Sequence, residues 1–274
     1  MKIQAPKGTR DLLPQESYQW QYIEGKLREI AGKYNIREVR TPIFEHTELF
    51  LRGVGDTTDI VQKEMYTFED RGGRSITLRP EGTAGAVRSF IEHGLCDGPQ
   101  PTKMCYISAP VFRYERPQAG RLRQHHQFGI EIFGAKEATA DAEAILLAYT
   151  VLQTLGVRNL SLNLNSIGCP TCRPKYSQAL KQYYQDKREA LCPTCLDRLE
   201  RNPLRLLDCK EPKCQEIAKG APKMIEYLCP ECQQHFEQLQ QYLADAGVAF
   251  QINPYIVRGL DYYTKTVFEI ISSE

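Results

Sequence analysis

The sequence predicts an α+β fold in which antiparallel hairpins alternate with helices. Three observations support this prediction. Two pairs of strand-like segments are each joined by a polar connection, amphipathic segments separate the pairs, and 274 residues are enough to bury a sizeable core. This order of elements disfavours a doubly wound parallel sheet.

The first elements are a helix, an extended segment and a hairpin. Apolar residues recur at helical spacing over 15–34, directly after Pro14, which favours a helix start. The segment IREVRTPIFE is β-rich, and Pro42 within it is expected at a sheet edge or bend. MYTFED and SITLRP flank RGGR, so we expect a hairpin whose Gly72 and Gly73 can take positive φ. A short helix follows over 83–95, with Thr83 as its N-cap.

The second hairpin joins a strand over 102–115 to a strand over 126–134 through an arginine-rich connection. A helix over 138–156 and a half-buried strand over 160–168 come next. The composition then changes: residues 169–247 are helical, cysteine-rich and charged, and strand character returns afterwards. We therefore predict that residues 1–168 and 248–274 form one discontinuous core domain, interrupted by a mainly helical, cysteine-rich insertion at 169–247.

Bulk composition excludes some classes of protein. The net charge of +1 argues against a surface that coats a polyanion as a whole, although a local basic site remains compatible with it. No apolar run approaches the roughly 20 residues of a membrane span. The N-terminus lacks the apolar stretch of a signal peptide, which predicts a cytoplasmic protein.

Four arginines crowd the connection of the second hairpin: Arg113, Arg116, Arg121 and Arg123. A guanidinium group is permanently charged and matches phosphate oxygens bidentately, so this loop suits a triphosphate lying across the hairpin. The alternative is a solvated run of charge.

A small polar pocket is expected next to this loop. Gln127 and Glu131 lie on one face of a strand with Gly129 between them, so two polar groups would stand over bare backbone. Glu81 precedes a helix start, where a carboxylate either binds a ligand or stabilises the helix N-terminus.

Several motifs together resemble the class II aminoacyl-tRNA synthetases. GKYNIREVRTPIFE is similar to their motif 1 and VFRYERPQAGRLRQHHQFGIE to their motif 2, and RGLDYYT resembles the signature of the histidyl-tRNA synthetases. The motifs occur in the family's order and cover essentially the whole chain. The resemblance implies a class II antiparallel sheet flanked by helices, and a ligase that activates L-histidine with ATP to histidyl-adenylate and transfers it to the 3′ end of tRNA(His).

The resemblance also implies roles for individual residues. Those that would bind histidine are Glu81, Thr83 and Gln127 at the α-amino group, Glu131 and Tyr263 at the imidazole nitrogens, and Tyr262 as a wall. Those that would bind ATP are Arg113 at the α-phosphate, Arg121 at the outer phosphates, and Arg258, which would bridge the histidine carboxylate and the α-phosphate. Mg²⁺ would assist, motif 1 implies a homodimer, and Arg116 and Gln118 at the loop tip are expected to read the tRNA acceptor end.

Eight of the ten cysteines form four closely spaced pairs: Cys169 and Cys172, Cys192 and Cys195, Cys209 and Cys214, and Cys229 and Cys232. Three pairs have the CPxC form of a zinc knuckle, and a reducing compartment argues against disulfides. We predict structural Zn²⁺ in up to two four-thiolate sites, with His235 close enough to replace one ligand. The pairs that share a metal are not specified by spacing. The alternative is a set of reduced thiols.

The RGLDYYT motif lies near the end of the chain. In the family, the pattern continues beyond this motif with motif 3 and an anticodon-binding domain. We therefore expect the N-terminal part of a longer enzyme, impaired when isolated. Two other functions are considered: a synthetase-like regulatory subunit of histidine biosynthesis that does not charge tRNA, and a zinc-stapled nucleic-acid module without enzymatic activity.

Overall fold

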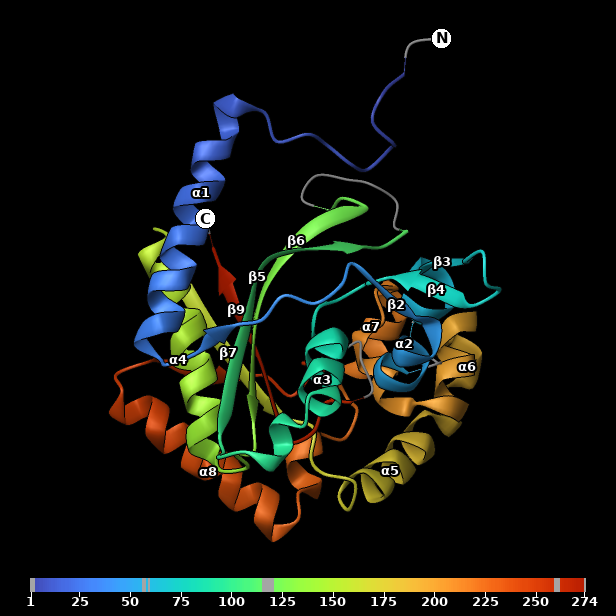
Figure 1. The fold of residues 1–274 in the computed structure, drawn as a ribbon. Helices are drawn as coiled ribbons and strands as arrows, with labels where there is room; N and C mark the ends of the chain where they lie inside the picture. Colours follow the sequence, from blue (N-terminus) through green and yellow to red (C-terminus); the bar gives the residue numbers. More distant parts are fainter. Residues whose placement is uncertain (1–2, 56–57, 59, 115–120, 259–261, 274) are drawn as a thin grey trace. The chain divides into compact units, whose positions relative to one another are not determined.

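The computed structural model describes residues 3–55, 58, 60–114, 121–258 and 262–273. The chain divides into two compact units: Met1–Lys136 with Leu147–Gly156, and Glu137–Leu146 with Val157–Glu274. These limits differ from the predicted segments, and the grouping of residues 1–168 with 248–274 into one core domain stays a prediction. The α+β class is confirmed, since helices alternate with mainly antiparallel sheets (Figure 1).

The first unit contains two three-stranded sheets. In one, β1 pairs in parallel with β5 and β5 pairs antiparallel with β6; in the other, β4 lies between β2 and β3, and both pairings are antiparallel. Its elements are α1 (Pro14–Lys33), β1 (Arg37–Glu38), β2 (Phe44–His46), α2 (Thr47–Val54), β3 (Tyr66–Glu69), β4 (Ser75–Leu78), α3 (Thr83–Glu92), β5 (Thr102–Phe112), β6 (Gln124–Phe133) and the second half of α4 (Ala138–Thr154).

The long hairpin of β5 and β6 is the scaffold of the first unit (Figure 1). Helix α1 begins at Pro14, one residue before the predicted start, and buries Leu27 and Ile30 against Cys105 of β5. Leu147 and other residues of α4 complete this core. The hairpin is therefore held by apolar packing on one face, which leaves its other face for polar side chains.

The second unit contains a sheet in the order β8-β7-β9, in which β7 is parallel to β8 and antiparallel to β9. Leu239 and Leu243 of α8 pack against Leu162 and Leu164 of β7. Its elements are β7 (Leu160–Ser166), α5 (Arg173–Gln185), α6 (Pro193–Arg201), α7 (Pro212–Ala218), α8 (Pro230–Asp245), β8 (Phe250–Ile252) and β9 (Thr266–Ser272), with short 3₁₀ segments between the helices.

The predicted insertion is helical in the structure and has a hydrophobic core of its own. Tyr176 and Tyr184 of α5 pack there with Leu199 of α6, Leu206 and Met224. Buried cysteines belong to the same cluster. Because a segment of short helices buries little surface, cross-links between the helices are expected to add substantially to its stability.

Two local predictions had different outcomes. Gly73 takes a φ of 75° in the first hairpin, as predicted. The prediction that Thr83 caps α3 is wrong, because Gly82 is the N-cap and Thr83 is the first helical residue. The reason is that the carboxylate of Glu81 accepts the hydrogen bonds of the first helical amides, those of Thr83 and Ala84.

Within the described ranges, no helix is both long and apolar enough to cross a membrane.

Candidate active site

The carboxylate of Glu81 accepts hydrogen bonds at the N-terminus of α3. Glu81 lies where β4 leads into α3, with only 4% of its surface exposed. Its two oxygens accept hydrogen bonds from the backbone N–H groups of Thr83 and Ala84, both at 2.7 Å. The first amides of a helix have no partner within the helix, so a carboxylate placed there stabilises the start of α3. The structural reading of Glu81 as a capping aid is therefore confirmed, and the carboxylate is fixed in orientation.

Three of the predicted histidine-binding residues lie near this helix start. Gln127 Oε1 accepts a hydrogen bond from the backbone N–H of Gly82 at 3.0 Å, which ties β6 to the residue after Glu81. Thr83 Oγ1 lies 3.3 Å from the hydroxyl of Tyr106 on β5. Glu131 shares the face of β6 with Gln127, and Thr83 hydrogen-bonds to its carboxylate. The structure thus brings Glu81, Thr83, Gln127 and Glu131 together.

The expectation of bare backbone at Gly129 is wrong. Tyr106 lies directly opposite Gly129 in the hairpin, and a Cβ at Gly129 or at Gly82 would overlap its ring. The tyrosine ring therefore fills the space that both glycines leave. Tyr106 was missed at the level of sequence, although an aromatic residue opposite a strand glycine is a known stabilising pair.

The two carboxyl groups of this pocket are unusually basic. Burial and the nearby charge of Glu81 together raise the pKa of Glu131 to about 7, although hydrogen bonds from Thr83 and Tyr106 oppose the shift. Burial also raises the pKa of Glu81, while its backbone hydrogen bonds act in the other direction. Perturbed carboxyl groups gathered in one place are typical of a binding or catalytic site.

Arg113 lies directly after β5 and is held from two sides. Its Nε donates a hydrogen bond to the carbonyl oxygen of Pro80 at 2.8 Å, and its backbone N–H donates one to Arg123 at 2.8 Å. The guanidinium group is therefore anchored beside the segment that carries Glu81.

The other loop arginines differ from Arg113. Arg121 is exposed, whereas the guanidinium of Arg123 lies 4.0 Å from the ring centre of Tyr114 and is used in packing. Arg116 and Gln118, the predicted tRNA contacts, lie outside the described residues.

The remaining predicted site residues belong to the second unit. The rings of Tyr262 and Tyr263 stack with their centres 5.0 Å apart, and Arg258 lies 5.8 Å from the centre of the Tyr263 ring. Arg258 Nη1 makes an ion pair with Glu269 of β9 at 2.6 Å. A cavity of about 170 Å³ beside Arg258 is also lined by Arg173, Arg201 and Arg205, so this part of the unit would attract anions.

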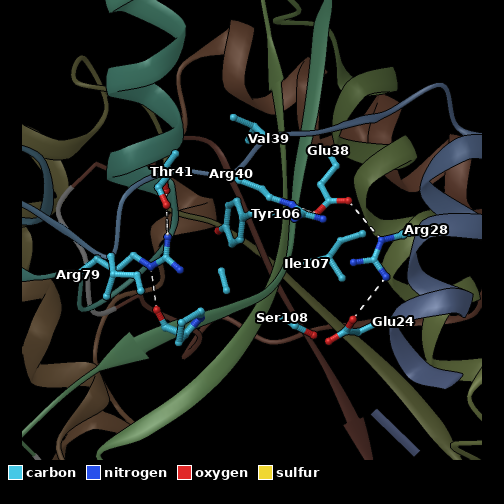
Figure 2. Close-up of a pocket in the computed structure, with 13 residues that line it drawn as sticks. Glu24, Arg28, Glu38, Val39, Arg40, Thr41, Arg79, Tyr106, Ile107 and Ser108 are labelled. Carbon is cyan, nitrogen blue, oxygen red and sulfur yellow. Dashed lines mark hydrogen bonds and ion pairs between the residues drawn. The ribbon is translucent and has the colours of Figure 1, made fainter. Parts of the chain in front are cut away.

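A larger cavity of about 430 Å³ lies in the first unit between α1, the segment after β1, and β5 (Figure 2). Its carboxylates already have arginine partners: Arg28 pairs with Glu24 and Glu38, and Arg40 also pairs with Glu38. Arg79 donates hydrogen bonds to carbonyl oxygens of the surrounding backbone. Because these charges neutralise one another, we place the candidate active site at α3 and β6 and not in this cavity.

The cysteines form two clusters, which settles the pairing that spacing left open. The first cluster contains Cys169, Cys172, Cys229 and Cys232; the second contains Cys192, Cys195, Cys209 and Cys214. In each cluster the four Sγ atoms lie within 4.8 Å of one another. The first and fourth cysteine pairs along the chain thus form one cluster, and the second and third pairs form the other.

The sulfur geometry fits a tetrahedral metal. Neighbouring Sγ atoms lie 3.6 and 3.9 Å apart in the first cluster and 3.8 Å apart in the second. Four thiolates about 2.3 Å from Zn²⁺ would be separated by about 3.8 Å. Disulfide sulfurs would be only about 2.0 Å apart. The Cys229 N–H donates to Cys172 Sγ at 3.1 Å and the Cys192 N–H to Cys214 Sγ at 3.4 Å, as expected around metal-bound thiolates.

The thiols of the first cluster differ in acidity. Burial raises the pKa of Cys169, but hydrogen bonds from the backbone of Cys172 and Thr171 and from other thiols outweigh burial and lower it to about 6. Burial raises the pKa of Cys232. A bound cation would compensate for ionising the remaining thiols.

The prediction that His235 could replace a thiol ligand is wrong. His235 belongs to neither of the two clusters of described residues. Its Nε2 lies 2.8 Å from a carboxylate oxygen of Asp141, and the histidine is 7% exposed. The ring is thus a hydrogen-bonded core residue at the contact between α8 and α4.

Comparison with known proteins identifies the family. A sequence model of the histidyl-tRNA synthetases matches residues 8–274. The chain belongs to the histidyl-tRNA synthetase family. It is 60% identical over all 274 residues to the histidine–tRNA ligases of Clostridium novyi (strain NT) and Clostridium botulinum (strain 657 / Type Ba4). It spans 66% of the length of each of these proteins.

Solved structures agree with this family. The crystal structure of the apo histidyl-tRNA synthetase of S. aureus matches 98% of the chain with a TM-score of 0.78 and 40% identity, and the chain covers 61% of that protein. A Bacillus halodurans protein described as an ATP phosphoribosyltransferase regulatory subunit/histidyl-tRNA synthetase matches with a TM-score of 0.66 and 22% identity, which shows a shared fold alone. The predicted class II fold is therefore confirmed for this member of the histidyl-tRNA synthetase family.

Proposed function

We propose that the protein is a histidine–tRNA ligase that forms histidyl-adenylate from L-histidine and ATP and transfers the histidyl group to the 3′ end of tRNA(His). The observation that carries this proposal is the grouping of Glu81, Thr83, Gln127 and Glu131 around the start of α3. These are the residues that resemblance to the family assigns to histidine. The 60% identity to proteins named histidine–tRNA ligase supports the same activity.

The proposed site binds the two ends of histidine differently. Oxygen acceptors bind the α-ammonium group, and a titratable carboxyl group, Glu131, binds the imidazole ring. The α-ammonium group has three N–H donors, and Glu81, Thr83 and Gln127 offer oxygen acceptors near one another. The imidazole ring binds to Glu131 and Tyr263, with Tyr262 as a wall. The pKa of Glu131, about 7, lies close to the value of about 6.5 for imidazole. The pair can therefore share one proton, so that the buried carboxylate gains a cationic partner.

Activation of histidine requires positioning and positive charge. A carboxylate oxygen of histidine attacks the α-phosphorus, and the bond from that phosphorus to the pyrophosphate oxygen breaks. The carboxylate is already ionised at neutral pH, so no general base is needed. Arg113 binds the α-phosphate, Arg121 the outer phosphates, and Arg258 bridges the carboxylate and the α-phosphate, which neutralises charge that builds up on phosphorus. Mg²⁺, when bound, would supply further charge neutralisation at the phosphates.

Two structural Zn²⁺ ions are proposed for the two cysteine clusters. Support comes from the tetrahedral sulfur spacing and from the backbone N–H groups directed at Cys172 and Cys214. Four thiolates leave no open coordination position, so the metal would be structural and not catalytic. Protein purified without chelator is expected to contain about two zinc ions per chain. A content near zero would reduce these cysteines to packing residues.

The proposed partners are a second copy of the chain and tRNA(His), in the cytoplasm. Tyr18 and Tyr22 of α1 are 61% and 58% exposed, and Phe44 of β2 is 56% exposed. Large exposed apolar side chains of this kind are typical of an interface, which supports the homodimer that motif 1 implies. Arg116 and Gln118 remain the proposed contacts to the acceptor end of the tRNA, which the insertion would help to hold.

Amino-acid-dependent exchange of pyrophosphate into ATP tests the proposal. The assay is run on the protein at its natural length with each of the twenty amino acids. Exchange with histidine alone, lost in Arg113→Ala, is the expected result. Exchange with no amino acid would reject the ligase and favour the regulatory subunit. That alternative has weaker support, because the similarity to a protein with such a description is 22%.

A further inference from the structure

Three residues next to the ligands of the first cluster contact the chain segment that contains Tyr263. Gly168, which precedes Cys169, accepts a hydrogen bond from the backbone N–H of Lys265 at 2.9 Å. Arg173, which follows Cys172, donates a hydrogen bond from Nη2 to the carbonyl oxygen of Tyr263. Glu231, which lies between Cys229 and Cys232, makes an ion pair with Lys265 Nζ at 3.0 Å.

The backbone at these contacts is conformationally demanding. Lys265 has a φ of 55°, in the left-handed region that a residue with a side chain seldom adopts. Such a conformation persists when surrounding contacts fix it. Gly168 has a φ of 62°, and a Cβ there would overlap Met224 and Cys172. Gly168 is therefore packed tightly against Cys172 of the first cluster, while its carbonyl oxygen contacts the backbone of Lys265.

Apolar packing continues the same connection. Tyr263 packs on a small core of Ile167, Ile256 and Val267. Ile167 donates its backbone N–H to the carbonyl oxygen of Lys265 at 2.8 Å, so Lys265 is held through both its N–H and its C=O. Cys169, the first cysteine of the cluster, directly follows Gly168 in the chain. A displacement of Cys169 would thus act directly on the peptide groups that support Tyr263.

The second cluster differs in its contacts. Cys195, Cys209 and Cys214 are buried in the insertion's core with Tyr184 and Leu199, and Cys172 and Cys232 of the first cluster belong to the same core. Among the described residues, Arg205, which lies between Cys195 and Cys209, approaches the RGLDYYT segment with its Nη1 3.5 Å from the carbonyl oxygen of Arg258. That distance marks a weak contact, and it leads to Arg258 and not to the tyrosines.

We propose that Zn²⁺ in the first cluster positions Tyr263 and thereby sets the affinity for histidine, with Arg173 and Lys265 as positioning residues, whereas the metal in the second cluster supports the insertion alone. This inference rests on the proposed role of Tyr263 in binding histidine. Four thiolates around one ion fix Gly168, Arg173 and Glu231 relative to one another. Without the ion, the three contacts to residues 263–265 would no longer have a common anchor.

The test compares cluster variants with variants that keep every thiol. Cys172→Ser removes a ligand from the first cluster, Cys195→Ser is the matched change in the second, and Arg173→Met and Glu231→Gln break single contacts. The protein at its natural length is analysed for zinc content, for hydrogen exchange at the amides of Ile167 and Lys265, and for the KM values of histidine and ATP in pyrophosphate exchange.

Cys172→Ser is expected to lose about one zinc ion, to speed exchange at Lys265, and to raise the KM for histidine roughly tenfold with little change for ATP. Arg173→Met should keep both zinc ions and still raise the KM for histidine. Cys195→Ser should lose a zinc ion without either effect.

Two results would overturn the proposal. One is loss of zinc from Cys172→Ser with unchanged exchange at Lys265 and unchanged KM for histidine; the other is an equal effect of Cys195→Ser. If Cys172→Ser does not fold, Arg173→Met and Glu231→Gln decide the question. Zinc content and hydrogen exchange need no amino acid, so wild-type protein that activates no amino acid would reject the ligase function separately from the coupling.

Discussion

Glu131→Gln is expected to stabilise the folded protein at alkaline pH while it weakens histidine binding. Burial raises the pKa of Glu131 to about 7, so above neutral pH the folded chain must hold a buried negative charge. A carboxyl group whose folded pKa lies above its unfolded pKa favours folding below the unfolded value, and that contribution is lost as pH rises through the folded value. Glutamine has nearly the same shape and no charge, so it removes the penalty.

The size of the effect follows from the two pKa values. The pKa rises from 4.5 to about 7, and each pKa unit corresponds to about 1.4 kcal/mol. Ionisation of Glu131 at pH 8 therefore costs up to about 3 kcal/mol more in the folded chain than in the unfolded chain. Since Glu131 is only partly buried, about 2 kcal/mol is the expected gain in the free energy of unfolding. For a chain of this size the gain corresponds to a rise in Tm of roughly 4–8 °C.

Thermal melts of wild type and Glu131→Gln at pH 5 and pH 8 measure this gain. The difference in Tm should be small at pH 5 and largest at pH 8. Glu69→Gln on the exposed end of β3 is the matched control and should show no such dependence. Added histidine should raise the Tm of wild type but not of Glu131→Gln. Equal Tm differences at both pH values would refute the reasoning, because the buried charge would then have no cost.

Three further predictions concern the same site. At pH 8, histidine binding should take up about one proton, because the ring binds as a cation beside Glu131. Calorimetry in buffers of different ionisation enthalpy measures the proton uptake. An uptake near zero would indicate a neutral bound ring. Arg113→Lys should slow pyrophosphate exchange by about 10²–10³-fold with little change in Tm, since lysine lacks the fork that contacts Pro80; unchanged exchange would contradict the α-phosphate role. Gly129→Ala should cost about 1–3 kcal/mol in denaturant melts because its methyl group overlaps Tyr106, and Tyr106→Leu in the same chain should recover part of the loss. If Gly129→Ala alone has no effect, Tyr106 does not occupy that space.

Local patterns predicted the helices and hairpins because each depends on neighbouring residues. Pro14 begins α1, and the strands around RGGR pair as expected. The relation of Tyr106 to Gly129 depends on hairpin register, in which β5 carries an irregularity between Tyr106 and Ala109. Counting residues inward from the loop gives the wrong partner across such an irregularity. The sequence could therefore identify the polar face of β6 but not the ring that covers it.

The cysteine clusters show a second limit of prediction from sequence. Three pairs have the same CPxC form, so their chemistry predicts metal ligation but not which pairs meet. The partition depends on how α5 to α8 fold back, which brings Cys229 within 3.9 Å of Cys169, sixty residues earlier in the chain. His235 was predicted as a substitute ligand from its closeness in sequence to Cys232, yet its ring contacts Asp141. Cys232 and His235 are three residues apart in α8 and therefore lie on neighbouring positions of one helix face. Closeness on a helix thus does not decide which partner a side chain binds, because the partner comes from another element.

Glu81 shows why a structural role and a binding role need not exclude each other. Each of its oxygens accepts one backbone hydrogen bond from the start of α3. The Thr83 side chain also hydrogen-bonds to this carboxylate. Because each carboxylate oxygen can accept two hydrogen bonds, an acceptor position still remains for a ligand. The same amides prevent the carboxylate from rotating away when the pocket is empty. Stabilisation of the helix therefore fixes the carboxylate, and the proposed binding of an ammonium group by Glu81 would lose little side-chain entropy, because that entropy is already lost on folding.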